Sequence, residues 1–239
     1  MANLLAIEAA SDSCSIALCV NNHTLERTEA APRMHSRLLY PMLNELMGEA
    51  GLSPKQLDAV IFVHGPGSFT GLRIAASTAQ GIGFACDTPL IGISTLQAMA
   101  QQSFHEHAAI NVLALMDARM NELYAGVYKL DPQLQLMQAL QKDQLCPQDI
   151  CLEQLCGTAN EHLYAVGHGL KLQDKLDHSI AQLAQQEPEQ ILLASSLLPM
   201  AKYLLAQGQV LKPEDVELVY LREQSHWKTI KQQKALKKS

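Results

Sequence analysis

Residues 59–85 have the sequence A-V-I-F-V-H-G-P-G-S-F-T-G-L-R-I-A-A-S-T-A-Q-G-I-G-F-A, which predicts a strand, a glycine-rich turn and a helix in succession. The apolar run from Ala59 to Val63 favours a strand that is buried on both faces. The glycines that follow allow a tight turn, and helical spacing then extends from about Thr70 to Ala85. A unit of this kind is typical of α/β proteins.

The glycine-rich turn could hold an anion, or it could be only a tight, capped turn. The first amides of a helix carry partial positive charge, and Ser68 and Thr70 could cap that helix. However, G-P-G-S-F-T-G lacks the G-K-[ST] ending of a Walker loop. Both interpretations stay open, and the candidate anion contacts on this turn are Gly65, Gly67, Ser68 and Thr70.

Two helices carry features that favour contact with a partner. On the helix after the turn, small residues recur every four positions, which lets another element of the same lobe or of another subunit approach closely. The preceding helix, from about His35 to Ala50, has more apolar residues than one buried stripe needs, so it is deeply buried or shared with a partner. We expect the partner interface to comprise Met34, Leu38, Leu39, Met42, Leu43, Leu46, Gly71, Ala75, Ala79 and Gly83. Leu46→Asp or Ala79→Arg should then abolish binding and leave the fold intact.

The order of the predicted elements repeats. The first half has strands near 3–8, 15–20 and 24–29, joined in part by an Asn21-Asn22 turn, then the units above, strand 90–93 and helix 95–102. The second half has strands 112–116, 122–129 and 134–140, helix 148–155, strand 162–166, helix 170–183, strand 190–194 and helix 196–207. Two such units predict an α/β protein of the actin-like (ASKHA) fold with two ribonuclease-H-like lobes. The expected domains are 1–105, 106–225 and a basic tail, 226–239.

Composition excludes several classes of protein. The apolar fraction of 48%, the charged fraction of 18% and a net charge of −6 indicate a globular chain without a general bias toward nucleic acid. The chain begins without a signal peptide and has no apolar run long enough to span a membrane, so we expect a cytoplasmic protein. The five lysines after Trp227 form either a solvated terminus or an arm that contacts phosphates. The six cysteines lack zinc-site spacing, and no metal site is expected.

Six segments together resemble the TsaB family. They are L-A-I-E-A-A-S (5–11), R-M-H-S-R-L-L-Y-P (33–41), H-G-P-G-S-F-T-G-L-R-I-A (64–75), G-I-S-T-L-Q-A-M-A (92–100), M-D-A-R-M-N-E-L-Y (116–124) and L-V-Y-L-R (218–222). The specific parts are G-P-G-S-F-T-G-L-R and D-A-R-x-x-E-x-Y, whereas residues 132–211 contribute little.

This resemblance implies a subunit of a tRNA-modifying complex. TsaB proteins pair, through their first two helices, with the paralogue TsaD, which transfers a threonylcarbamoyl group to the adenosine next to the anticodon of tRNAs that read codons beginning with A. The ATPase TsaE joins them, and tRNA is bound only through the complex. The resemblance implies a heterodimer with TsaD, a homodimer when the chain is alone, and no cofactor of its own, with ATP and Mg²⁺ bound at the level of the complex.

Two departures from the related proteins affect the expected chemistry. TsaD holds its metal with H-x-x-x-H, and Thr95 and Met99 stand at those positions here, so the chain should not catalyse the transfer. Actin-like ATPases carry an aspartate at the end of the first strand, where this chain has Glu8, followed by Ser11. By this resemblance, Glu8 and Ser11 join the candidate nucleotide contacts. The alternatives are an independent actin-like ATPase or kinase, and a glycoprotease-type peptidase, for which no catalytic motif is found.

Overall fold

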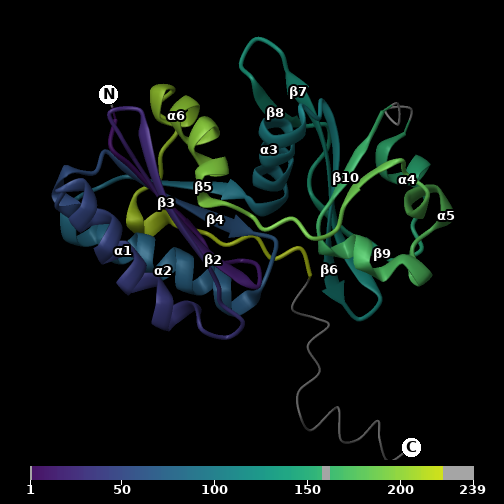
Figure 1. The fold of residues 1–239 in the computed structure, drawn as a ribbon, viewed down its shortest axis with the longest axis horizontal. Coiled ribbons are helices and arrows are strands. Elements are labelled where there is room, and N and C mark those ends of the chain that lie inside the picture. The colour runs from purple at the N-terminus through teal and green to yellow at the C-terminus, as the bar shows by residue number, and fades with distance from the viewer. Residues whose placement is uncertain (1, 158–161, 223–239) are drawn as a thin grey trace, which may run out of the picture.

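Two mixed β-sheets form the centres of two lobes that lie side by side (Figure 1). This computed structural model describes residues 2–157 and 162–222. The first sheet has the strand order β3-β2-β1-β4-β5, and the second has the order β11-β10-β6-β7-β8, with β9 paired to β7.

The first sheet contains β1 (Leu4–Glu8), β2 (Ser13–Val20), β3 (His23–Ala30), β4 (Ala59–Gly65) and β5 (Leu90–Ser94). β1, β2 and β3 are antiparallel neighbours, whereas β1, β4 and β5 run parallel. The turn between β2 and β3 has positive φ at both Asn21 and Asn22, as a tight hairpin requires. The predicted Asn-Asn hairpin is confirmed.

The second sheet contains β6 (Asn111–Arg119), β7 (Glu122–Asp131), β8 (Leu136–Ala139), β9 (Gln144–Pro147), β10 (Tyr164–Val166) and β11 (Gln185–Glu187). β6, β7 and β8 are antiparallel, and β6, β10 and β11 are parallel. Its order β8-β7-β6-β10-β11 therefore repeats the order of the first sheet. The repetition confirms the predicted actin-like fold with two ribonuclease-H-like lobes.

The helices are α1 (His35–Ala50), α2 (Phe69–Cys86), α3 (Thr95–His107), α4 (Leu152–Cys156), α5 (His178–Ala181) and α6 (Leu198–Ala206). Short 3₁₀ helices cover Pro54–Gln56, His168–Lys175, Ala194–Leu197 and Pro213–Asp215. α1 has its predicted bounds and ends at Gly51, whose φ of 64° suits glycine. Ser53 and Gln56 form a capping box at the 3₁₀ helix that follows. α3 lies between the two sheets (Figure 1) and packs chiefly on the second.

Two predictions for the second half were wrong. In place of a continuous helix over residues 170–183, a 3₁₀ segment ends at Lys175 and α5 begins at His178. The break has a local cause, because the Asp177 side chain accepts a hydrogen bond from the Ser179 amide and so starts a new helix. Residues 190–194 form no strand, and the fifth strand of the sheet is β11, which ends just before Pro188.

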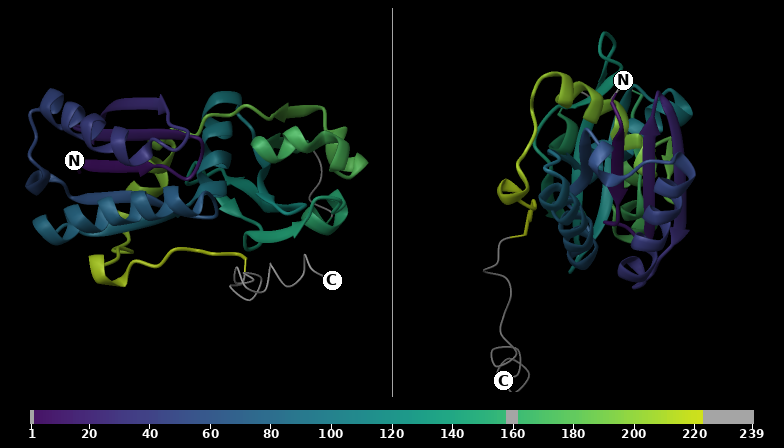
Figure 2. Two further views of the ribbon diagram at one scale, coloured as in Figure 1. Left: turned by 90° about the horizontal axis from the view of Figure 1, so that it is seen from below. Right: turned by 90° about the vertical axis from the view of Figure 1, so that its left-hand side faces the viewer.

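The chain returns to the first lobe after the second sheet (Figure 2). The Ala194 amide donates to Ser15 Oγ at 2.9 Å, and Ser195 Oγ donates to Glu26 at 2.8 Å. Leu211 then pairs with Leu90 at the edge of the first sheet. The predicted domain division remains a prediction, although residues 194–222 pack largely on the first lobe. The predicted basic tail, 226–239, lies outside the described residues.

None of the described helices combines the length and the apolar character needed to cross a membrane.

Candidate functional site

α1 and α2 lie next to each other on one face of the first sheet (Figure 1) and form a groove of about 440 Å³ between their outer sides. The groove is lined by Ser36, Tyr40, Phe69, Thr70, Arg73, Ile74, Ser77 and Thr78. These residues come from the two helices predicted to contact a partner, but none of them is among the predicted interface residues.

The predicted interface residues are mostly buried inside the lobe. The buried members are Leu39, Met42, Leu43, Leu46, Gly71, Ala75, Ala79 and Gly83. Leu38 is half-buried, and Met34 is 39% exposed. The assignment of the eight buried residues as a partner surface is therefore corrected, because the rows of apolar side chains on α1 fill the core against the first sheet and α2. Leu46→Asp and Ala79→Arg cannot be neutral for the fold.

The small residues of α2 allow close packing within the same lobe. A Cβ atom added at Gly71 would lie 1.7 Å from the Ala9 carbonyl oxygen, so only glycine fits there. A Cβ atom at Gly83 would lie 2.8 Å from Pro213 Cγ. The stripe thus brings α2 against the loop after β1 at one end and against the returning C-terminal segment at the other.

The outer sides of these helices expose large side chains that sequence analysis did not select. Tyr40, Phe69 and Phe84 are 55%, 50% and 63% exposed. Phe84 follows Arg73 by about three helical turns, so both lie on the same side of α2. The outer helix face, as the term is used below, consists of the exposed residues Met34, Tyr40, Phe69 and Phe84.

The Phe69 end of the outer helix face is ordered by neighbouring contacts. The Arg73 guanidinium carbon lies 4.0 Å from the centre of the Phe69 ring. The Tyr220 ring lies 5.4 Å from Phe69, and the Tyr220 hydroxyl accepts a hydrogen bond from Arg73 Nε at 3.3 Å. Exposed aromatic rings beside an arginine are the residue types enriched in protein interfaces. This arrangement suits the binding of another protein.

The glycine-rich turn packs tightly against the chain's own backbone. Ser68 donates its amide to the Ala10 carbonyl at 2.9 Å, and its hydroxyl caps α2 by accepting from the Gly71 amide. A Cβ atom at Gly67 would lie 2.9 Å from the Ala10 oxygen. At Gly65, where φ is +122°, a Cβ atom would lie 2.6 Å from the Val219 oxygen. This geometry supports the tight, capped turn over the anion site, and the exposed Thr70 belongs to the groove.

Glu8 and Ser11 lie together as expected, but they bond to each other. Glu8 is fully buried, and its carboxylate accepts from the Ala10 amide at 2.6 Å, the Ser11 amide at 3.2 Å and the Ser11 hydroxyl at 3.1 Å. Burial raises the pKa of Glu8 to about 7, against the opposing effect of these hydrogen bonds. A buried carboxyl group that is engaged in this way is a structural link in the loop after β1, and the geometry does not support its proposed role toward nucleotide.

The raised pKa of Glu8 makes stability depend on pH. Because the folded chain holds this proton more tightly than the unfolded chain, the stabilisation is complete below about pH 4.5 and is lost as pH rises through about 7. The full difference is about 3 kcal/mol for a pKa raised from 4.5 to about 7. Wild type should therefore lose free energy of unfolding between pH 5 and pH 8, as Glu8 loses its proton. The Glu8→Gln variant cannot ionise at this position, so its free energy of unfolding should fall less over the same range. Urea unfolding at both pH values measures this, and parallel pH profiles would contradict it.

Three of the segments that resemble the TsaB family meet between the lobes. The Val219 amide donates to the His64 carbonyl at 2.8 Å, which links L-V-Y-L-R to the glycine-rich turn. Arg222, from the same segment, forms an ion pair with Glu122 of D-A-R-x-x-E-x-Y and donates to the Ala118 carbonyl at 3.2 Å. The C-terminal segment therefore fastens the first lobe to the β6–β7 hairpin of the second (Figure 2).

Thr95 and Met99, which the resemblance aligns with the paralogue's metal ligands, both lie on α3. Thr95 has no exposed area, and Met99 is buried. The Met99 methyl group fills the space beside Gly167, where an added Cβ atom would lie 2.4 Å from it. Met99 therefore serves the packing of α3 against the second lobe, whereas the buried Thr95 hydroxyl has no hydrogen-bond partner among the described residues.

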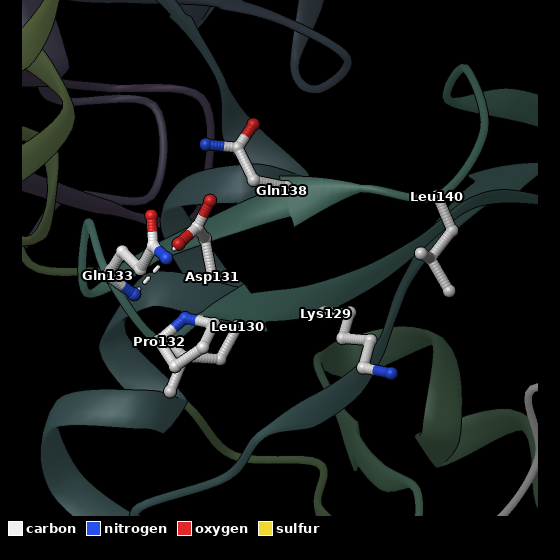
Figure 3. Close-up of a pocket in the computed structure, with 7 residues that line it drawn as sticks. All are labelled: Lys129, Leu130, Asp131, Pro132, Gln133, Gln138 and Leu140. Carbon is white, nitrogen blue, oxygen red and sulfur yellow. Dashed lines mark hydrogen bonds between the residues drawn. The ribbon is translucent and has the colours of Figure 1, made fainter.

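The cysteine thiols and a hollow on the second lobe lack the features of a catalytic site. Burial raises the pKa of the Cys14 thiol to about 12 and the pKa values of Cys146 and Cys156 to about 11, whereas a cysteine nucleophile needs a lowered pKa. A hollow on the β7–β8 hairpin is lined by residues such as Lys129, Asp131 and Gln138 (Figure 3). Figure 3 shows that these side chains point in different directions and do not converge on one point.

Comparisons with known proteins find a matching family model and similar proteins. The family model described as "TsaD: tRNA N6-adenosine threonylcarbamoyltransferase" matches residues 20–143. A protein of Haemophilus influenzae named "tRNA threonylcarbamoyladenosine biosynthesis protein TsaB" is 34% identical over 95% of this chain and 96% of its own length. A protein of the same name from Escherichia coli K12 is 31% identical over 95% of this chain and 97% of its own length.

A solved structure has the same fold over nearly the whole chain. The structure titled "YeaZ from Pseudomonas aeruginosa" superimposes with a TM-score of 0.84 at 31% identity and covers 92% of this chain and 100% of that one. An identity of 34% over almost the full length of a TsaB protein is high enough to show a common family. The chain belongs to the TsaB family.

Proposed function

We propose that this chain is a non-catalytic subunit that binds and activates a TsaD paralogue during threonylcarbamoylation of the adenosine next to the anticodon of tRNAs that read codons beginning with A. The proposal rests on the family of the chain and, above all, on the outer helix face. α1 and α2 present exposed aromatic side chains beside Arg73, and this is the surface on which the paralogue would dock.

We choose the paralogue as the occupant because the family model that matches most of the first lobe and the start of the second is named for that transferase. That model carries the name of the transferase and matches residues 20–143, which include all of α1 and α2. Paralogous lobes present related helix pairs, so two such faces can pack pseudo-symmetrically, as in an isologous dimer. On the same surface, a homodimer would form when the paralogue is absent.

The transfer chemistry belongs to the paralogue in this proposal. Thr95 and Met99 are buried and offer neither imidazole nor carboxylate to a metal. The Glu8 carboxyl group is occupied by its own loop, which weighs against an independent ATPase. The chain then needs no cofactor of its own, while ATP and Mg²⁺ act at the level of the complex.

The remaining partners follow from the same role. TsaE joins the pair, tRNA is bound only through the complex, and the complex works in the cytoplasm. The net charge of −6 agrees with a subunit that does not bind tRNA by itself.

Complex formation tests the proposal. The chain is co-expressed with the TsaD paralogue of the same organism and analysed by size-exclusion chromatography with light scattering. A one-to-one heterodimer is expected. Separate elution of the two proteins at micromolar concentration would overturn the proposal.

A further inference from the structure

Three side chains with metal-ligating atoms meet at the C-terminal end of α3, away from the outer helix face. Glu106 and His107 are the last two residues of α3, and Glu187 is the last residue of β11. His107 Nε2 lies 3.3 Å from Glu187 Oε2 and 3.9 Å from Glu106 Oε2. All three ligand atoms lie within 4.8 Å of one another.

Each of the three side chains is oriented by a neighbour. The buried Gln102 donates from Nε2 to Glu106 Oε1 at 3.0 Å, which leaves Glu106 Oε2 on the side of His107. The Tyr164 ring stacks on the His107 imidazole with centroids 5.1 Å apart, and its hydroxyl donates to Glu187 Oε2 at 3.4 Å. Groups that orient the ligands in this way are typical of metal sites, where they reduce the cost of arranging the ligands.

The cluster has more negative than positive charge. When His107 is neutral, the two carboxylates carry two negative charges, and within residues 2–157 and 162–222 no lysine or arginine forms an ion pair with either of them. The C-terminal end of a helix also disfavours a carboxylate and favours a cation. A divalent cation would neutralise the carboxylates in a position that the helix itself favours.

We propose that Glu106, His107 and Glu187 bind one zinc ion. An imidazole nitrogen with two carboxylate oxygens is a ligand set that zinc accepts, with water in the fourth position. Ligand atoms of a tetrahedral zinc site are about 3.3 Å apart, given bonds of about 2.0–2.1 Å. The separations of His107 Nε2 from the two carboxylates, 3.3 Å and 3.9 Å, are close to this value. Rotation of the half-exposed Glu106 side chain would bring its carboxylate to the same distance from Glu187.

The ion would have a structural role. It would join the end of α3 to β11, a three-residue strand at the edge of the second sheet that pairs only with β10 among the described strands. No metal site was expected from the sequence, because that expectation rested on the spacing of the cysteines. Glu187 comes from a distant segment and completes the group.

Zinc titration into chelator-treated protein, followed by calorimetry and by thermal unfolding, tests the proposal. We expect one ion per chain and a higher Tm with zinc. His107→Gln and Glu187→Gln should each weaken zinc binding at least ~10-fold, and Tyr164→Phe, which keeps the stacking ring, should weaken it by a similar factor. His105→Gln, on the same end of α3 but outside the cluster, is the matched control and should bind zinc as wild type does.

Zinc could instead bind to cysteine thiols elsewhere on the chain, and Co²⁺ distinguishes that binding from binding at the proposed site. Co²⁺ bound at the proposed site gives a spectrum without thiolate charge-transfer absorption. Each carboxylate or imidazole variant should keep its metal-free Tm, because none of the three side chains is buried in the core. The proposal is overturned if wild type binds no zinc, or if Glu187→Gln and His107→Gln bind it as tightly as wild type.

Discussion

Leu46→Asp is expected to unfold the first lobe. Leu46 has no exposed area and lies in the core between α1, the first sheet and α2. Removal of a buried leucine side chain costs about 2–5 kcal/mol, and an unpaired buried carboxylate adds several kcal/mol. The sum is comparable with the whole stability of a typical domain, about 5–15 kcal/mol. Circular dichroism and the yield of soluble protein measure the outcome. Ala79→Arg should have the same result, because Ala79 is equally buried.

Asn44→Asp is the matched control for Leu46→Asp. It introduces the same charge on α1, two residues away, at an exposed position. Ser77→Arg is the corresponding control for Ala79→Arg on α2, because Ser77 is exposed. Both controls should stay within about 0.5 kcal/mol of wild type, as surface substitutions usually do. A folded Leu46→Asp variant with wild-type stability would show that α1 does not pack as described.

Phe69→Asp is expected to remove binding to the TsaD paralogue while the chain stays folded. Phe69 is half exposed and is the first residue of α2. An aspartate there faces the positive end of the helix and can pair with Arg73 one turn later, so the fold should not suffer. In the complex, the same carboxylate would be buried in an apolar contact. We expect a loss of about 3 kcal/mol, which is about 100-fold in Kd.

Ile110→Asp is the control for this surface. Ile110 is 53% exposed and lies in the second lobe, so the variant makes the same kind of change with similar exposure away from the outer helix face. Its Kd for the paralogue, measured by calorimetry, should equal that of wild type. Equal binding by Phe69→Asp and wild type would place the interface elsewhere on the chain.

The first lobe could be predicted closely from the sequence because its signals are local. Apolar runs bounded by turns predict β1 and β4, and the helix predicted from about His35 to Ala50 matches α1. Helix 170–183 failed because helical spacing persisted across Asp177, whose side chain starts a new helix there. The short strand β11 has a polar sequence, Q-Q-E, which no apolar pattern could reveal.

The partner residues predicted on α1 and α2 are mostly core residues of the first lobe. Periodicity counts the apolar residues of α1 but does not show how much of them the sheet and α2 cover together. Both neighbours bury side chains of α1, so residues such as Leu39 and Leu46 are core. Tyr40 lies outside the apolar rows of α1, Phe84 lies on α2, and both are exposed. An aromatic residue on the polar side of an amphipathic helix was the signal that could have identified them.

The contact between Arg222 and Glu122 was beyond sequence reasoning for a different reason. Both residues lie in segments that resemble the TsaB family, but a separation of 100 positions gives no indication that they pair. The fold brings them together where the returning C-terminal segment reaches the β6–β7 hairpin. Segments that looked like independent motifs therefore form one link between the lobes.

Reconstituted tRNA modification tests the proposed role most directly. The TsaD paralogue, TsaE, the synthase that supplies the threonylcarbamoyl-adenylate and an unmodified tRNA are incubated with this chain, with its Phe69→Asp variant, or with neither, and threonylcarbamoyladenosine is quantified by mass spectrometry of the digested tRNA. We predict efficient modification with wild type, and background levels with the variant or when the chain is omitted. Equal modification in all three reactions would contradict the role of this chain as the activating partner.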